Sequence, residues 1–265
     1  MPERRPNSND LDTSFWTTLQ YRLLRKISPG EPTYMSGAAY AHKSKLRVLL
    51  GDDLLERMKD KNVLDFGCGH GTEAVEMAGV AKSVYGLDIL EESLNIARAH
   101  ASEAGVTNRC TFGTTPPSHA IDAIVSLDSF EHFGSPADIL ATMYSLLRPG
   151  GQVLISFGPT WYHPLGGHLF SVFPWAHLLF TESALIRWRS DFKTDGARKF
   201  GEVAGGLNQM TIGRFERLVS QTKFKTVSLE TVPIKKLKPV ANSLTREFTT
   251  AIVRSVLEKP ASAIA

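Results

Sequence analysis

Hydrophobic and polar positions alternate between two periodicities in the middle of the chain. Short apolar runs with the character of buried strands stand at 63–66, 83–89, 109–114, 121–128 and 152–157. Apolar residues at helical spacing fill the intervals, most clearly at 90–104 and 136–147. Strands that alternate with helices predict a mostly parallel sheet covered on both faces, with ligands bound at the carboxyl ends of its strands.

The two flanking regions predict helices and further strands. Residues 1–60 are expected to form a helical cap over the sheet edge, or equally over a pocket, because their apolar residues recur at roughly helical spacing. Residues 210–221 predict a helix and 224–232 a strand, whereas 245–259 suit either. We therefore expect 209–265 to close the same domain, where two late strands would add an antiparallel edge to the sheet.

Residues 159–208 interrupt the alternation and are expected to form an aromatic-rich insertion. Nine aromatic residues fall between positions 157 and 192. Aromatic walls with a few polar groups are typical of a pocket for an apolar small molecule, so this insertion is a candidate substrate lid. Two other interpretations stay open. The aromatics could be the core of an added helical hairpin, or, beside Arg187 and Arg189, a segment that dips into a membrane boundary.

Composition and charge narrow the range of partners. The chain has 265 residues, 42% of them hydrophobic, and a net charge of +3, too small to indicate nucleic-acid binding. The least interrupted apolar stretch, 169–180, is shorter than the roughly 20 residues that span a bilayer. The polar first ten residues do not suggest a signal peptide, and two cysteines suggest neither disulfides nor zinc. A reducing cytoplasm is the expected location.

Three glycines at alternate positions follow the first strand. Gly67, Gly69 and Gly71 stand between an apolar run and a segment that can open a helix, where a bare backbone lets a ligand approach. The dinucleotide fingerprint G-x-G-x-x-G would place its third glycine at Thr72, so the spacing argues against a dehydrogenase. Asp88 ends the second strand, where a carboxylate can accept both hydrogen bonds of a ribose diol.

At this point the sequence resembles the class I S-adenosylmethionine-dependent methyltransferases. Four motifs carry the resemblance in the expected order: "VLDFGCGHG", "VYGLDI", "IDAIVSLDSFEHF" and "LLRPGGQVLISF". The resemblance implies an α/β fold, Rossmann-like and doubly wound, with a mostly parallel seven-stranded sheet, an antiparallel edge strand and a helical insertion. Residues 61–158 would then be the cofactor-binding core, and S-adenosylmethionine the cofactor.

The resemblance also implies roles for single residues. Asp65 and the turn after it would surround the methionine end of the cofactor, and this turn comprises Gly67, Cys68, Gly69 and Gly71. Asp88 would hold the ribose and Ile89 would pack on adenine. Leu127 and Asp128, at the end of the fourth strand, would face the sulfonium.

One cofactor contact departs from the family pattern. After the third strand many members have an acid that binds the adenine amino group, whereas this chain has "FGTTPP". The hydroxyl or carbonyl group of Thr114 is the candidate substitute.

Three histidines are candidates for the base that removes a proton from the acceptor: His132, His163 and His168. In some quinone-pathway and small-RNA methyltransferases, residues spaced like Asp128, Glu131 and His132 surround a divalent cation, and such ligands suit Mg²⁺ or Mn²⁺. Because the Glu-His pair is also widespread without metal, no metal site is predicted.

The leading hypothesis is a methyltransferase that acts on an oxygen of a small apolar or aromatic metabolite. Carbon or nitrogen methylation of a lipid or quinone-like acceptor, and a catalytically inactive cofactor-binding partner protein, are the alternatives. The expected partner is a small-molecule acceptor, without nucleic acid and without a transmembrane segment, though peripheral membrane contact is not excluded. The sequence leaves the oligomeric state open.

Overall fold

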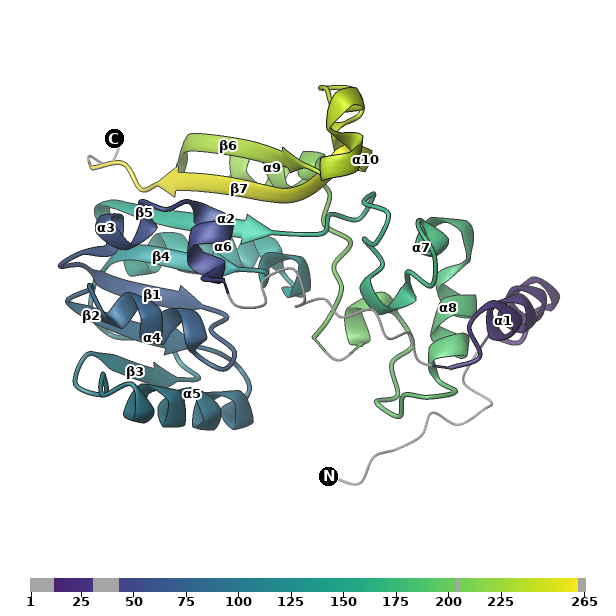
Figure 1. Cartoon of the computed structure of the whole chain (residues 1–265), viewed down its shortest axis with the longest axis horizontal. Helices are drawn as coiled ribbons and strands as arrows, with labels where there is room; N and C mark the ends of the chain where they lie inside the picture. Colours follow the sequence, from purple (N-terminus) through teal and green to yellow (C-terminus); the bar gives the residue numbers. More distant parts are fainter. Residues whose placement is uncertain (1–11, 31–42, 204, 262–265) are drawn as a thin grey trace.

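A computed structural model describes residues 12–30, 43–203 and 205–261 of the chain (Figure 1). A seven-stranded sheet with the order β3-β2-β1-β4-β5-β7-β6 forms its centre. The strands are β1 (Asn62–Phe66), β2 (Ser83–Leu87), β3 (Cys110–Gly113), β4 (Ile121–Leu127), β5 (Leu147–Phe157), β6 (Lys225–Pro233) and β7 (Thr250–Glu258). The chain therefore alternates strand and helix as the hydrophobic pattern predicts.

The sheet is parallel from β3 to β5 and antiparallel where β7 joins it. The predicted Rossmann-like sheet with an antiparallel edge is confirmed. The antiparallel strand itself, β7, lies one position inside the edge, because β6 pairs with its outer side. Both late strands therefore belong to the sheet that carries the glycine turn.

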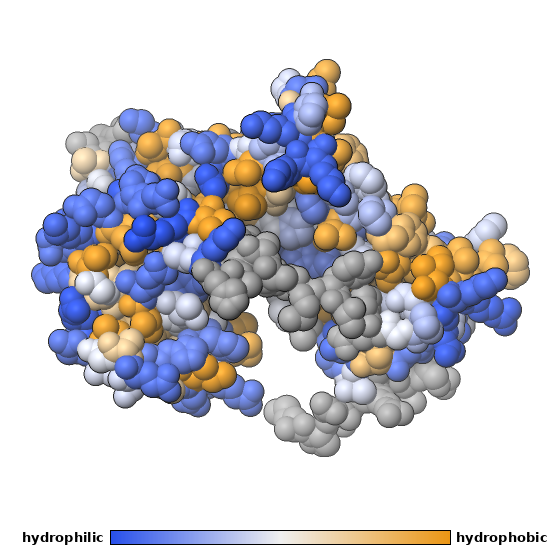
Figure 2. All heavy atoms as spheres, in the orientation of Figure 1, coloured by the Kyte–Doolittle hydropathy of each residue, from blue (hydrophilic) through white to orange (hydrophobic). Residues whose placement is uncertain are grey.

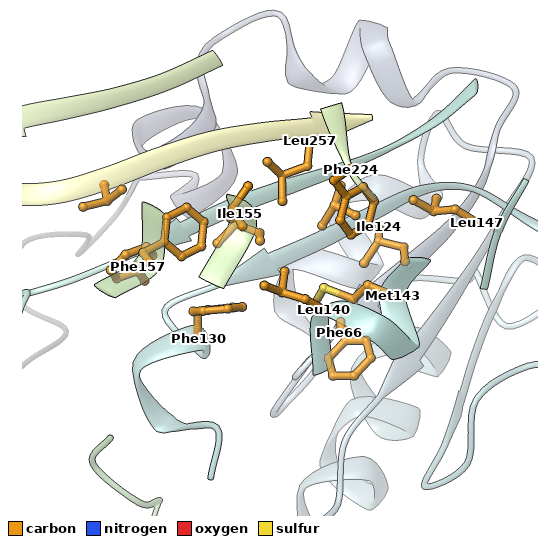
Figure 3. Close-up of a cluster of buried hydrophobic side chains, with 14 of the residues drawn as sticks. Phe66, Ile124, Phe130, Leu140, Met143, Leu147, Ile155, Phe157, Phe224 and Leu257 are labelled. Carbon is orange, nitrogen blue, oxygen red and sulfur yellow. The ribbon is translucent and has the colours of Figure 1, made fainter. Parts of the chain in front are cut away.

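Helices cover both faces of the sheet, as Figure 1 shows. They are α2 (Lys45–Leu50), α3 (Leu54–Met58), α4 (Thr72–Ala78), α5 (Glu91–Glu103), α6 (Pro136–Leu146) and α9 (Ile212–Ser220). On one face, Leu140 of α6 packs with Phe130 and strand residues (Figure 3). Phe215 of α9 belongs to the same cluster. On the other face, α2 to α5 pack against the alternate strand residues. Because successive side chains of each strand point to opposite faces, the sheet has two hydrophobic cores, one on each face.

The helices within residues 1–60 divide between two parts of the molecule. Helices α2 and α3 lie against the sheet, and their buried side chains join the sheet core. In contrast, α1 (Phe15–Ile27) lies beside α8 (Glu182–Arg189), away from the sheet (Figure 1). Leu24 of α1 is buried in a third apolar cluster with Trp188 and other side chains of the insertion.

The insertion also contains α7 (Ala176–Leu179) and the 3₁₀ turns η4 (His168–Phe170) and η5 (Phe200–Glu202). Its apolar cluster includes Phe170, Leu185, Trp188 and Phe200. The expected helical insertion after β5 is therefore present, and it has a core of its own.

Two boundaries differ from the sequence prediction. The sequence places the fifth strand at 152–157, whereas β5 begins at Leu147 and residues 148–151 form a bulge inside it: β4 advances from Ile121 to Ala123 while β5 advances from Leu147 to Gln152. Residues 245–259, which suit a helix or a strand, contain both, the short helix α10 (Arg246–Thr249) and then β7. The 3₁₀ turn η6 (Lys235–Val240) precedes them.

Candidate functional site

The glycine turn after β1 is closed by backbone hydrogen bonds. The N–H groups of Gly67 and Cys68 both donate to the carbonyl of Leu87, at 2.8 and 3.1 Å, and that of Gly71 donates to the carbonyl of Cys68 at 2.9 Å. All three glycines have positive φ, at 83°, 49° and 74° in chain order. Because side chains other than hydrogen disfavour these angles, the turn requires glycine at each position.

The three glycines nevertheless meet different surroundings. A Cβ atom at Gly67 would lie 2.7 Å from Oγ of Ser129, and one at Gly71 would lie 2.6 Å from Cβ of Ala97. A Cβ atom at Gly69 would meet nothing within 4 Å. Gly67 and Gly71 therefore serve close packing, while Gly69 presents bare backbone to open space, as a bound cofactor requires.

Asp88 stands beside this open backbone at the carboxyl end of β2. Its Oδ2 accepts a hydrogen bond from the N–H of Gly69 at 2.9 Å, and its Oδ1 accepts one from the N–H of Leu90 at 2.9 Å. These two bonds fix the carboxylate and leave lone pairs for a further donor, such as a ribose hydroxyl. The next residue, Ile89, is exposed, as is Thr114 after β3, so both predicted adenine contacts lie on an open edge.

Asp65 lies buried beneath the turn. Among the described residues its Oδ2 has no hydrogen-bond partner. Burial, reinforced by the negative charge of Glu73 and opposed by Lys45, raises the pKa of Asp65 to about 8. An acceptor oxygen without a donor fits the ammonium group of an amino acid, so the residues present suit the methionine end of S-adenosylmethionine.

Asp128 forms an ion pair that the sequence interpretation missed. Its Oδ2 lies 2.9 Å from Nζ of Lys45, on α2. Asp128 has a positive φ of 44°, and Leu127 before it is buried at the end of β4. Burial raises the pKa of Asp128, against the charge of Lys45. No local pattern links two residues so far apart in the chain; only the fold brings α2 to the end of β4.

Glu131, His132 and His168 form a cluster next to this strand end. One potential ligand atom from each lies within 4.8 Å of the others, and the two imidazole centroids are 5.2 Å apart. Glu131 and His132 belong to η3 (Phe130–His132), which follows β4, whereas His168 comes from η4 in the insertion. His168 joins the pair in place of Asp128, whose carboxylate is engaged by Lys45.

The cluster contains polar atoms without partners. Within the described part of the chain, neither Oε2 of Glu131 nor Nε2 of His168 has a hydrogen-bond partner, although both are buried. Nδ1 of His132 lies 2.8 Å from the carbonyl of Gly206, which orients its other nitrogen. Burial raises the pKa of Glu131 to about 8 and lowers the pKa of His168 to about 4. An imidazole and a carboxyl group of this kind can relay a proton or hold a divalent cation.

A small pocket opens beside this cluster. Its volume is about 110 Å³, and its walls comprise His132, Gly167, His168, Leu169, Phe170, Arg189, Val203, Gly206 and Leu207. Ser129 links the glycine turn to the cluster, because its Oγ donates to the carbonyl oxygens of Gly67 and Leu127 and its own carbonyl accepts a hydrogen bond from the N–H of His132 at 2.9 Å. His132 in turn lines the pocket, so a short series of contacts joins the glycine turn to the pocket.

Three side chains of the insertion, one of them a predicted base, do not line this pocket. The ring of Trp161 packs on His177 and Phe200, at 4.7 and 5.4 Å between centroids, and neither Trp161 nor Phe173 lines the pocket. Nδ1 of His163 accepts a hydrogen bond from the N–H of Leu165, and burial lowers the pKa of His163 to about 4. His163 does not line the pocket either, so the structure brings together only His132 and His168 of the three candidate bases.

The strand order β3-β2-β1-β4-β5-β7-β6, with β7 antiparallel and a glycine turn after β1, is that of the class I methyltransferase fold. A family model described as a methyltransferase domain matches residues 40–229, and the chain belongs to this family. The predicted membership of the S-adenosylmethionine-dependent methyltransferases is thereby confirmed, and S-adenosylmethionine is the cofactor of this family.

Curated relatives match a segment of the chain. A ubiquinone biosynthesis O-methyltransferase of Serratia proteamaculans is 40% identical over 103 residues, which is 37% of this chain and 42% of the relative. One of Sodalis glossinidius is 38% identical over 123 residues, 43% of this chain and 48% of the relative. The chain therefore spans less than half the length of these two relatives.

Solved structures share the fold at low sequence identity. The [4+2]-cyclase SpnF aligns with a TM-score of 0.55 at 15% identity, over 93% of this chain and 96% of the cyclase. An S-adenosylmethionine-dependent methyltransferase of Mesorhizobium loti aligns with a TM-score of 0.51 at 18% identity, over 77% of this chain and 95% of that one. These similarities establish the fold alone.

Proposed function

We propose that this protein transfers a methyl group from S-adenosylmethionine to an oxygen of a small apolar or aromatic acceptor. The observation that carries the proposal is the cluster of Glu131, His132 and His168, which lies against an apolar pocket directly after β4. The names of the relatives, O-methyltransferases of ubiquinone biosynthesis, support an oxygen acceptor and suggest a hydroxylated ring.

The residues of the chain divide the work of such a transfer. The cofactor supplies a methyl group activated by a positive sulfur. Asp88 and the backbone at Gly69 hold the ribose side, and buried Asp65 accepts from the amino-acid end. In the pocket, Phe170 and Leu207 exclude water and orient the ring of the acceptor. A hydroxyl proton is then taken by His132 or His168, and general-base catalysis of this kind is typically worth about 10²–10⁴-fold in rate.

Two alternatives stay open as proposals. A carbon or nitrogen acceptor, on a lipid or quinone-like molecule, needs less help from a base, so the cluster would then matter less. The second alternative is a protein that binds the cofactor without transferring a methyl group. The structural similarity to a cyclase supports keeping it, because the fold alone does not decide the reaction. The cytoplasmic location also remains a proposal, supported by two free, buried cysteines.

The direct test is a search for a labelled product. The purified protein is incubated with methyl-labelled cofactor and a set of phenols, catechols and hydroxylated quinols, and mass spectrometry locates the label. We expect label on one oxygen, and a loss of about 10²–10⁴-fold in turnover for His132→Ala or His168→Ala with unchanged cofactor affinity. Label on carbon or nitrogen, or full turnover by both variants, would contradict the proposal.

A further inference from the structure

Helix α1 exposes an apolar face that packs on nothing in the described structure. Phe15, Leu19, Leu23 and Ile27 are spaced by four residues and therefore lie on one side of the helix, with Trp16 beside them. Phe15 is 75% exposed and Trp16 68%, and the three aliphatic residues are 47–49% exposed. A helix of a water-soluble protein usually turns such a face inward, so this exposure indicates an external partner.

The exposed face continues beyond α1. Leu178 and Leu179 on α7 are 36% and 70% exposed. Figure 2 shows hydrophobic atoms from the region of α7 to the end of α1 on the same side of the molecule. We call these seven residues the apolar stripe: Phe15, Trp16, Leu19, Leu23, Ile27, Leu178 and Leu179.

Positive charge borders the apolar stripe. Helix α1 carries Arg22, Arg25 and Lys26 and has no acidic residue. Arg25 pairs with Asp191, whereas Arg22 and Lys26 are exposed and, within the described residues, make no ion pair. By its position on the helix, Lys26 follows Arg22 by four residues along one edge of the stripe. An apolar face edged by cations matches an anionic lipid surface, where aromatic and aliphatic side chains enter the boundary and cations meet headgroups.

The opposite side of α1 is fixed to the insertion. Leu24 is fully buried, the hydroxyl of Tyr21 donates to Asp191, and Nη1 of Arg187 donates to Thr18. The stripe is therefore held rigidly on the outside of the unit whose Phe170 and Leu207 line the pocket. By contrast, Trp188 and Arg189, which the membrane interpretation of the sequence would expose, are buried.

We infer that α1 lies flat on an anionic lipid bilayer and docks the enzyme there through the apolar stripe. Within the described residues no helix is long and apolar enough to span a bilayer, and α1 has only 13 residues, which suits a helix in the interface plane. A second copy of the chain is the less suitable occupant, since a two-fold contact through this face would bring the cations of two α1 helices together. The inference does not depend on which atom the enzyme methylates.

The test is co-sedimentation of the full chain with vesicles. Vesicles of phosphatidylcholine alone are compared with vesicles of equal parts phosphatidylcholine and phosphatidylglycerol, in low and high salt. We expect binding to the anionic vesicles and its weakening by salt, because salt screens charge at the surface. Absence of binding to anionic vesicles would overturn the inference.

Two pairs of variants separate the apolar from the charged contribution. The double variant Leu19→Glu, Leu23→Glu should lower vesicle binding at least about tenfold, because two exposed leucines no longer enter the lipid. Its control, Val240→Glu with Leu244→Glu, changes two exposed apolar residues outside the stripe, at 55% and 92%, and should bind like the parent. Equal loss in both pairs would contradict the role of α1.

The charged pair is Arg22→Glu with Lys26→Glu. It should reduce binding to anionic vesicles by about fivefold for each cation, while the exposed control pair Lys235→Glu with Lys236→Glu should not. Cofactor affinity serves as the check of folding for all variants. Light scattering completes the test by measuring the oligomeric state of the parent and of the double variant Leu19→Glu, Leu23→Glu. If the parent is a dimer and this variant is a monomer, the stripe binds a second copy of the chain and the lipid inference is overturned.

Discussion

At the scale of single residues, Gly69 and Gly71 both have a positive φ but differ in packing, because Gly69 faces open space and Gly71 is closely packed. We predict that Gly69→Ala keeps the fold, with about 1 kcal/mol lost through its positive φ, and weakens cofactor binding because the new methyl group stands in the open approach. Gly71→Ala should instead unfold or strongly destabilise the chain, because its Cβ would meet Ala97 and Phe112 at 2.6 and 2.9 Å. Thermal melts with and without S-adenosylmethionine distinguish the two effects. Undiminished cofactor stabilisation of Gly69→Ala would disprove the assignment of Gly69.

The raised pKa of Asp65 predicts that the free energy of unfolding depends on pH. Its pKa is raised from 3.8 to about 8 by burial, so the native state binds a proton that the unfolded state has already released. The contribution of Asp65 to stability is therefore complete below about pH 4 and is lost as the pH rises through about 8. The slope is at most about 1.4 kcal/mol per pH unit for one group.

Urea unfolding of the cofactor-free protein at several pH values measures this slope. Asp65→Asn should reduce it without abolishing it, because Glu131 has its pKa raised in the same direction. An unchanged slope in Asp65→Asn would show that this carboxyl group ionises normally.

The residues that sequence alone identified are those fixed by a local motif. The glycines and Asp88 stand within 22 positions of one another along one strand-turn-helix-strand unit, and the structure joins them by the hydrogen bond from Gly69 to Asp88. Lys45 and His168 were not assigned to Asp128 and Glu131 because each reaches its partner only through the fold. Helix α2 supplies Lys45, and the path of the insertion supplies His168.

At the scale of elements, the C-terminal segment stabilises α9 from outside. Oε2 and Oε1 of Glu247, on α10, accept hydrogen bonds from the first N–H groups of α9, at Ile212 (3.0 Å) and Gly213 (2.8 Å). The carboxylate thus accepts hydrogen bonds from N–H groups that have no partner within the helix. Its negative charge also interacts favourably with the positive N-terminal end of the helix dipole.

We predict that Glu247→Ala lowers the free energy of unfolding by about 1–2 kcal/mol, the usual scale for losing such a cap. Glu247→Gln keeps an acceptor and the length of the side chain, so it should lose less. Urea unfolding of both variants checks this order. If Glu247→Ala is as stable as the parent, water replaces the carboxylate at no cost and the cap is unimportant.

The elements that the hydrophobic pattern predicted correctly are those whose pairing is local. Strands β1 to β5 are apolar runs that follow one another closely, most of them with a helix between, and the connections of such units leave few alternatives. The place of β7 between β5 and β6 depends on pairing over about a hundred residues, which no window of sequence records. The position of α1 also depends on contacts between residues far apart in the chain. Its outward apolar face resembles a core face, although only Leu24 and Thr17 of this helix are buried.

At the scale of the whole molecule, the proposed cofactor site and the pocket belong to different parts of the chain. The cofactor site is proposed on the sheet and its glycine turn, whereas the insertion, which packs against α1, supplies most walls of the pocket. The family similarity therefore predicts the cofactor and says little about the acceptor, because the matched relatives share less than half their length with this chain.

This division predicts that the pocket can be filled without loss of the cofactor site. Val203 is half-buried in the wall of a cavity of only about 110 Å³, so the ring of Val203→Phe should displace the acceptor. We expect the KM for the acceptor to rise at least about tenfold, the scale on which a pocket discriminates small steric changes, with cofactor affinity unchanged. Val227→Phe is the matched control, because Val227 is 51% exposed on β6 and should leave both constants unchanged. Calorimetry with the cofactor and steady-state kinetics with the identified acceptor measure the two effects. Since a filled pocket cannot weaken a cofactor that binds on the sheet, equal loss of both affinities would mean that cofactor and acceptor share the pocket, and the division between sheet and insertion would have to be abandoned.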